Sequence, residues 1–220
     1  MDQSFEHYNI LAGLFAYPDS NFPANVKQVQ KYLDQNYPKA GAELKNFTKF
    51  VSNASQTELE ELFTRSFDVQ AVTTLDLGYV LFGDDYKRGA VLVNLNREHR
   101  EAGNDCCNEL ADHLPNILRL LCKMQKPELR IELVEKIVAP ALQKIIGEFD
   151  PEKLEKKNTI YKKHHKTLIE QSKKYGLIYQ HTLKAVYKVL ETDFKIKEVQ
   201  TTRQSAGFLK SVGSEMKIES

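Results

Sequence analysis

Apolar residues recur every three or four positions along most of the 220-residue chain, and this spacing places them on one face of an α-helix. Proline, glycine and capping residues divide the pattern into segments of helical length. No run alternates apolar and polar residues between turn signals, as a half-buried strand would, and no internal repeat of fixed period is present. The pattern predicts helices at residues 3–17, 23–37, 39–51, 57–68, 75–82, 84–102, 112–124, 127–147 and 151–194.

These elements predict an all-α fold, a single-domain helical bundle of about eight or nine helices. We expect the helical domain to cover residues 1–194 and residues 195–220 to form a mobile tail, because the apolar periodicity ends there. The segment Thr57-Glu58-Leu59-Glu60 has the spacing of a capping box. Pro140 is expected to kink the helix that contains it, because proline removes a backbone hydrogen bond.

Composition and charge narrow the classes of partner. The net charge is +1, so the whole protein has no field that favours nucleic acid or acidic lipid. The basic stretch at 151–174, with the pair His164-His165, is best interpreted as a solvated face. The first residues lack a basic region before their apolar stretch, and no segment is long and apolar enough to span a membrane. We therefore expect no secretory signal and no membrane insertion.

The three cysteines, Cys106, Cys107 and Cys122, do not form a disulfide framework, because their number is odd and two of them are adjacent. They fit a reducing cytoplasm, and the absence of a CxxC spacing argues against a thiolate metal site. The glycine-rich phosphate loop, GxSxG, HExxH and paired Glu-x-x-His motifs are all absent. We expect no catalytic residues, no metal site and no cofactor.

Two unusual clusters remain, at 82–89 and 112–115. Asp112 is suited to cap a helix and Pro115 to its first turn, but a cap does not explain His113, which could donate to a peptide carbonyl. Arg88 could pair with Asp84 one turn away or with the more distant Asp112. The neighbouring glycine, residue 89, lies inside a predicted helix, where glycine is unfavourable, and this indicates close approach by another helix or by a bound peptide.

The order of these clusters resembles a known family. The segments that carry the resemblance are Leu11-Ala12-Gly13-Leu14-Phe15-Ala16-Tyr17-Pro18-Asp19, Glu61-Leu62-Phe63-Thr64-Arg65-Ser66-Phe67-Asp68, Leu81-Phe82-Gly83, Arg88-Gly89 and Asp112-His113-Leu114-Pro115. Together they resemble the redox-enzyme maturation chaperones of the dimethyl-sulfoxide-reductase (TorD/NarJ-like) family, and most of all its nitrate reductase assembly branch. The resemblance covers about residues 5–146, and its strength lies in order and spacing, since each motif is short.

The resemblance implies an all-helical, cytoplasmic protein without enzymatic activity. Such chaperones bind the N-terminal leader of a molybdoenzyme catalytic subunit and hold the apoprotein until molybdenum cofactor is inserted. The partner implied here is therefore the apo catalytic subunit of a molybdopterin oxidoreductase, and we expect the chaperone to be a monomer or weak dimer. The segment 112–115 matches the motif implicated in leader recognition.

A leader of this kind would bind as an amphipathic helix in an apolar groove. We expect the helices at 75–102 and 112–124 to form its walls and Asp84, Asp85 and Asp112 to attract basic leader residues, so that affinity falls with salt. The residues predicted to bind the client peptide are Tyr79, Phe82, Gly83, Tyr86, Arg88, Gly89, Asp112, His113, Leu114 and Pro115. Two alternatives stay open: a general helical adaptor with another protein client, and an enzyme of unrecognised type.

Overall fold

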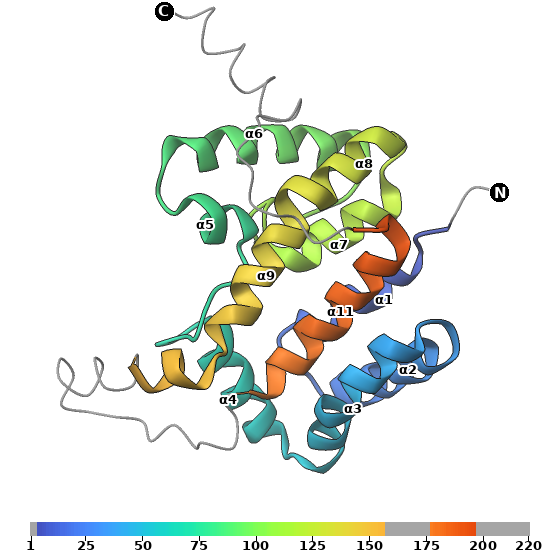
Figure 1. The fold of residues 1–220 in the computed structure, drawn as a ribbon, viewed down its shortest axis with the longest axis vertical. Coiled ribbons are helices and arrows are strands. Elements are labelled where there is room, and N and C mark those ends of the chain that lie inside the picture. The colour runs from blue at the N-terminus through green and yellow to red at the C-terminus, as the bar shows by residue number, and fades with distance from the viewer. Residues whose placement is uncertain (1–3, 157–176, 197–220) are drawn as a thin grey trace, which may run out of the picture. The chain divides into compact units, whose positions relative to one another are not determined.

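The computed structural model describes residues 4–156 and 177–196 and is shown in Figure 1. Its helices are α1 (His7–Ala12), the 3-10 turn η1 (Gly13–Phe15), α2 (Phe22–Asn36), α3 (Pro38–Asn53), α4 (Gln56–Phe67), α5 (Leu77–Phe82), α6 (Tyr86–Glu101), α7 (Leu114–Lys123), α8 (Pro127–Leu133), the π-helix η2 (Val134–Val138), α9 (Ala139–Glu148) and α11 (Ile178–Phe194). Residues 151–156 are also helical. Within these ranges there is no β-strand, so the predicted all-α class is confirmed.

Contacts group the chain into two compact units, each assembled from segments distant in sequence. The first unit contains described residues 4–16, 75–142 and 190–196, and the second contains 17–74, 143–156 and 177–189. The predicted domain limit at residue 194 remains a prediction. The expected tail from residue 197 onward, and positions 157–174 of the basic stretch, lie outside the described residues.

In the first unit, α1 packs against α7. The helix α7 is strongly amphipathic because Leu114, Ile117, Leu118 and Leu121 recur at helical spacing, and all four are fully buried. Removing such a side chain, as in Leu118→Ala, typically costs about 2–5 kcal/mol of stability. This core fixes the start of α7, where one of the two sequence clusters lies.

The second unit is organised around the α2–α3 pair and an aromatic cluster. Phe47, Phe149 and Tyr179 are buried, and the ring of Tyr179 lies 4.7 Å from that of Phe67 in an edge-to-face arrangement. Burial raises the pKa of the Tyr179 hydroxyl, which therefore stays protonated. This unit contains none of the residues predicted to bind a client.

The predicted starts of α1 and α4 need correction, and the backbone ahead of Pro140 forms a π-helix. The capping box of α4 uses Ser55 with Glu58, because Ser55 has the extended backbone that a cap requires; the predicted box at Thr57 is wrong. The first helix starts at His7, four residues later than expected. Ahead of Pro140, which has no backbone N–H to donate, Val134–Val138 form the π-helix η2, and the Ala139 N–H donates to the Val134 carbonyl. None of the helices described is long and apolar enough to cross a membrane.

Candidate functional site

A glycine turn joins α5 to α6 and brings both helices to one side of the first unit (Figure 1). Gly83 has φ +61°, a conformation that side chains other than glycine rarely adopt. Two residues later Asp85 caps α6, where its side chain accepts a hydrogen bond from the Lys87 backbone N–H at 2.9 Å. The predicted separation of the helices at 75–82 and 84–102 is confirmed.

The starts of α5 and α7 are tied together through their backbones. The N–H of Leu77 donates to the carbonyl of Asp112, and the N–H of Leu114 donates to the carbonyl of Leu75, both at 2.9 Å. Asp76 and His113 thereby face each other across an isolated antiparallel bridge. Each of these two residues is the N-cap residue of its helix, yet neither caps with its side chain. Their side chains are therefore available to each other.

Asp112 is fully buried, and its carboxylate is the centre of the contacts. Its Oδ2 accepts from the Gly78 N–H at 3.1 Å and from Arg88 Nε at 3.2 Å. The predicted role of Asp112 as the N-cap of α7 is therefore wrong, because its side chain bonds to α5 and α6. Of the two partners considered for Arg88, the structure selects Asp112 over Asp84. A charge buried this completely is stable only when it is paired and hydrogen-bonded.

Arg88 also donates through Nη2 to Asp76 at 3.1 Å, and the other oxygen of Asp76 lies 3.0 Å from His113 Nδ1. We call Asp76, Arg88, Asp112 and His113 the carboxylate–arginine cluster. The hydrogen bond with His113 is the main cause that lowers the pKa of Asp76, and it outweighs burial, which acts in the opposite direction. Burial opposes the charge of Arg88, but Asp112 and then Asp76 together raise its pKa, so it stays protonated.

A second polar network holds the loop that leads into residue 112. His99 is buried; its Nε2 lies 2.9 Å from the Ala111 carbonyl and its Nδ1 lies 2.9 Å from the amide nitrogen of Asn104. Asn104 also donates to the carbonyl of Asn116 at 3.1 Å. Burial is the main cause that lowers the pKa of His99, which fits a neutral ring that donates to Ala111 and accepts from Asn104.

Exposed aromatic side chains lie beside the carboxylate–arginine cluster. Tyr79 is 43% exposed, and the Arg88 guanidinium lies 5.2 Å from the centre of its ring. Tyr86, on the first turn of α6, is 65% exposed, whereas Phe82 is half-buried. Exposed tyrosines supply large, rigid contact surfaces of the kind found where proteins bind peptides.

The structure brings four of the ten predicted site residues together and places two others in the core. Tyr79, Arg88, Asp112 and His113 are brought together, whereas Leu114 and Pro115 are buried in the core. Gly89 is exposed, and a Cβ at this position would meet no described atom within 4 Å apart from its chain neighbours and the backbone of its own helix. The proposed close approach by a neighbouring helix is therefore wrong. Whether any of these residues contacts a client remains a prediction.

The sequence interpretation missed Asp76, Gly78 and His99. Asp76 and Gly78 lie in the predicted helix at 75–82 without any local motif. Their partners, His113 for Asp76 and Asp112 for Gly78, are more than thirty residues away. The one available signal was Gly78 itself, a glycine at a helical position, which indicates close approach by another group. His99 gave no signal, because its partners belong to a loop.

These contacts fix the starts of α5 and α7 relative to each other and leave the exposed Tyr79 beside them. In the part of the chain that the structure describes, no group of three His, Cys, Asp or Glu side chains could hold a metal ion.

Comparison of the sequence with models of known protein families finds no match, and comparison with curated protein sequences finds none either.

Proposed function

We propose that this chain is a maturation chaperone for the catalytic subunit of a molybdopterin oxidoreductase, and that it acts by binding the N-terminal leader of that subunit. One observation supports this most strongly. Two of the separate motifs that resemble the TorD/NarJ-like family, Arg88 and Asp112-His113, are joined by ion pairs beside the exposed Tyr79. Helix caps that form independently of one another would not bring these residues into contact.

The binding surface in this proposal consists of Tyr79, Phe82 and Tyr86, with His113 at its edge. An amphipathic leader helix would lay its apolar face on these rings, with anchors one turn apart. Asp84 and Asp85 are exposed close by and attract basic residues of the leader. Folding of the leader on binding keeps the affinity moderate, which suits a chaperone that must release its client.

The carboxylate–arginine cluster supports this surface from behind. Asp112 is fully buried and paired with Arg88, so it cannot attract the leader directly, as the sequence interpretation expected. Its role is to fix the position of α5, whose residue Tyr79 also stacks against Arg88. Loss of Asp112 would therefore weaken leader binding through misplacement of Tyr79.

The proposal includes a cytoplasmic location, because a leader must be held before export, and it includes no catalytic step and no resident cofactor. Whichever nearby gene encodes a molybdopterin oxidoreductase subunit identifies the client to be tested. The leader of that subunit, fused to a carrier protein, is the bait for capture of the purified chain. A fusion with a scrambled leader is the control bait.

The expected result is capture of the wild-type chain by the leader and loss of capture in the double variant Tyr79→Ala, Tyr86→Ala. The matched control is Tyr17→Ala, which removes a tyrosine of similar exposure, 57%, from the second unit. Failure of the wild-type chain to bind any leader would refute the proposed function. Equal capture of the double variant would refute the assigned surface, and equal capture by the scrambled bait would favour a general peptide adaptor.

A further inference from the structure

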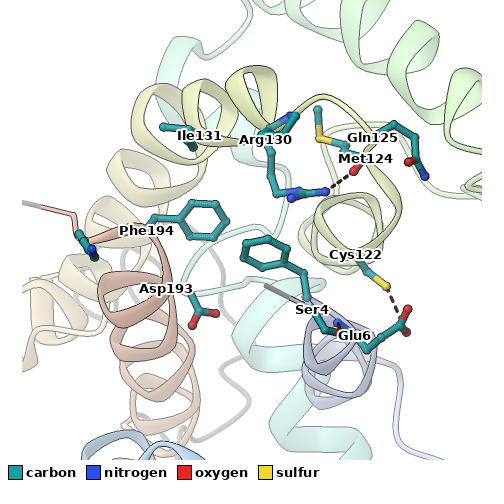
Figure 2. Close-up of a pocket in the computed structure, with 12 residues that line it drawn as sticks. Ser4, Glu6, Cys122, Met124, Gln125, Arg130, Ile131, Asp193 and Phe194 are labelled. Carbon is teal, nitrogen blue, oxygen red and sulfur yellow. Dashed lines mark hydrogen bonds between the residues drawn. The ribbon is translucent and has the colours of Figure 1, made fainter. Parts of the chain in front are cut away.

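The first unit contains a pocket that is separate from the tyrosine surface. It has a volume of about 660 Å³ and lies among the start of the chain, the end of α7, α8 and the end of α11. Figure 2 shows Arg130 and Ile131 on the α8 wall, Asp193 and Phe194 at the end of α11, and Cys122 with Glu6 on the remaining side. Pockets of a few hundred to about a thousand cubic ångströms hold small ligands or the end of a peptide.

Arg130 is the distinctive residue of this pocket. Its side chain is half-buried and lies 4.4 Å from the centre of the Phe5 ring, which is itself stacked on Phe194 at 5.3 Å. One terminal nitrogen donates to the Met124 carbonyl. The Nε–H is buried and has no hydrogen-bond partner among the residues that the structure describes. Burial accordingly lowers the pKa of Arg130, although a guanidinium still keeps its proton.

Within residues 4–156 and 177–196, no carboxylate forms an ion pair with Arg130. Among the ion pairs of the described residues none includes Arg130, whereas Arg65, Arg88 and Arg97 each have an acidic partner. The acidic groups of the pocket are engaged elsewhere. Asp193 accepts from His7 and Tyr8 at 2.7 and 2.9 Å, and Glu6 lies 3.4 Å from the thiol of Cys122. A half-buried cation with unused donors and aromatic neighbours is a binding group for an anion.

We propose that this pocket binds a monoanionic carboxylate that carries an apolar group, with the carboxylate on Arg130 and the apolar part between Phe5, Phe194 and Ile131. A single negative charge fits better than a phosphate dianion, because Glu6 and Asp193 already supply negative charge on the opposite walls. The chemistry is shared by a free organic acid and by the C-terminal carboxylate of a peptide. This site is independent of the proposed chaperone activity.

The test uses the intact chain and a natural reporter, the thiol of Cys122. Cys122 lines the pocket, whereas Cys107 is exposed outside it and serves as the internal control. The rate of alkylation by iodoacetamide is measured for each cysteine by mass spectrometry, with and without 3-phenylpropanoate. Since a ligand of this size binds with a Kd of about 1 mM, a concentration of about ten times Kd should slow modification of Cys122 about tenfold. Modification of Cys107 should not change.

Three comparisons decide the chemistry. The neutral amide, 3-phenylpropanamide, and the dianion phenyl phosphate should each protect Cys122 at least about tenfold more weakly, because one lacks the charge and the other carries too much. Arg130→Met should abolish protection while Arg97→Met, a matched change on α6, should leave it intact. Equal protection by acid and amide, stronger protection by phenyl phosphate, or no protection by any acid would overturn the proposal. If Arg130→Met does not fold, the acid and amide comparison on the wild-type chain decides alone.

A last pair of probes distinguishes the source of the carboxylate. Acetyl-Ala-Phe with a free C-terminus is compared with the same dipeptide as its C-terminal amide. Tighter protection by the free-acid dipeptide than by 3-phenylpropanoate assigns the pocket to a protein C-terminus. Protection by 3-phenylpropanoate alone assigns it to a small organic acid. Both results support a carboxylate site.

Discussion

Replacement of Gly78 by alanine tests the buried position of the Asp112 carboxylate. A Cβ on Gly78 would lie 2.7 Å from Asp112 Oδ2 and 3.4 Å from Arg88 Cγ. The carboxylate must then withdraw by several tenths of an ångström, and it loses the hydrogen bond from the Gly78 N–H at 3.1 Å. A hydrogen bond to a charged group contributes about 1.5–3 kcal/mol. Alanine returns up to about 1 kcal/mol through its higher helix propensity.

The net result is a loss of about 0.5–2 kcal/mol in the free energy of unfolding. With a urea dependence of about 2 kcal/mol per molar, the midpoint of unfolding should fall by about 0.25–1 M. The assay is urea unfolding followed by circular dichroism, since the chain lacks tryptophan. The control is Gly89→Ala, because a Cβ there meets no described atom within 4 Å, so this variant should gain up to about 1 kcal/mol. Equal stabilisation by both substitutions would refute the placement of Asp112.

Three further predictions concern pH and salt. The pKa of Asp76 is lowered in the folded protein, so the stabilisation that its carboxylate provides is present above pH 3.8 and is lost as the pH falls through the folded pKa. The difference in unfolding free energy between wild type and Asp76→Asn should therefore vanish in acid. A difference that stays constant with pH would contradict the pairing. The pKa of His99 is lowered below 6.5 in the folded protein, so on acidification the imidazole is protonated in the unfolded chain before it is protonated in the folded one. The free energy of unfolding therefore falls as the pH drops below about 6.5. The urea midpoint of His99→Gln should fall less than that of wild type between about pH 7 and pH 5. Leader affinity measured by fluorescence anisotropy should weaken with added salt, and less so in Asp84→Asn, whereas a salt-independent affinity would argue against acidic steering.

The helices could be predicted from sequence because their information is local. Periodicity, proline and glycine gave the α2, α3 and α7 helices within a few residues of their observed bounds. The ends were less certain where two candidate caps lie close together. Ser55 and Thr57 both satisfy the composition of a capping box, and only the backbone conformation selects Ser55.

The candidate site could be predicted only in part, because its bonds join distant segments. Arg88 had two candidate partners, Asp84 one helical turn away and Asp112 24 residues away, and the sequence alone does not distinguish them. The composition around Asp112 favours a cap on the following helix. Its side chain instead accepts a hydrogen bond from a backbone N–H 34 residues earlier in the sequence. Asp76 and His99 carry no local signature at all. Distant pairing therefore accounts for each of these errors.

In our proposal, the chain prepares a molybdoenzyme catalytic subunit for insertion of its cofactor. The most direct measurement is the molybdenum content of that subunit, purified from cells with the chain, without it, or with the Tyr79→Ala, Tyr86→Ala variant. We expect full loading with the wild-type chain and with Tyr17→Ala, and only a small fraction of that loading without the chain or with the double variant. Full molybdenum content in cells that lack the chain would refute the proposed function.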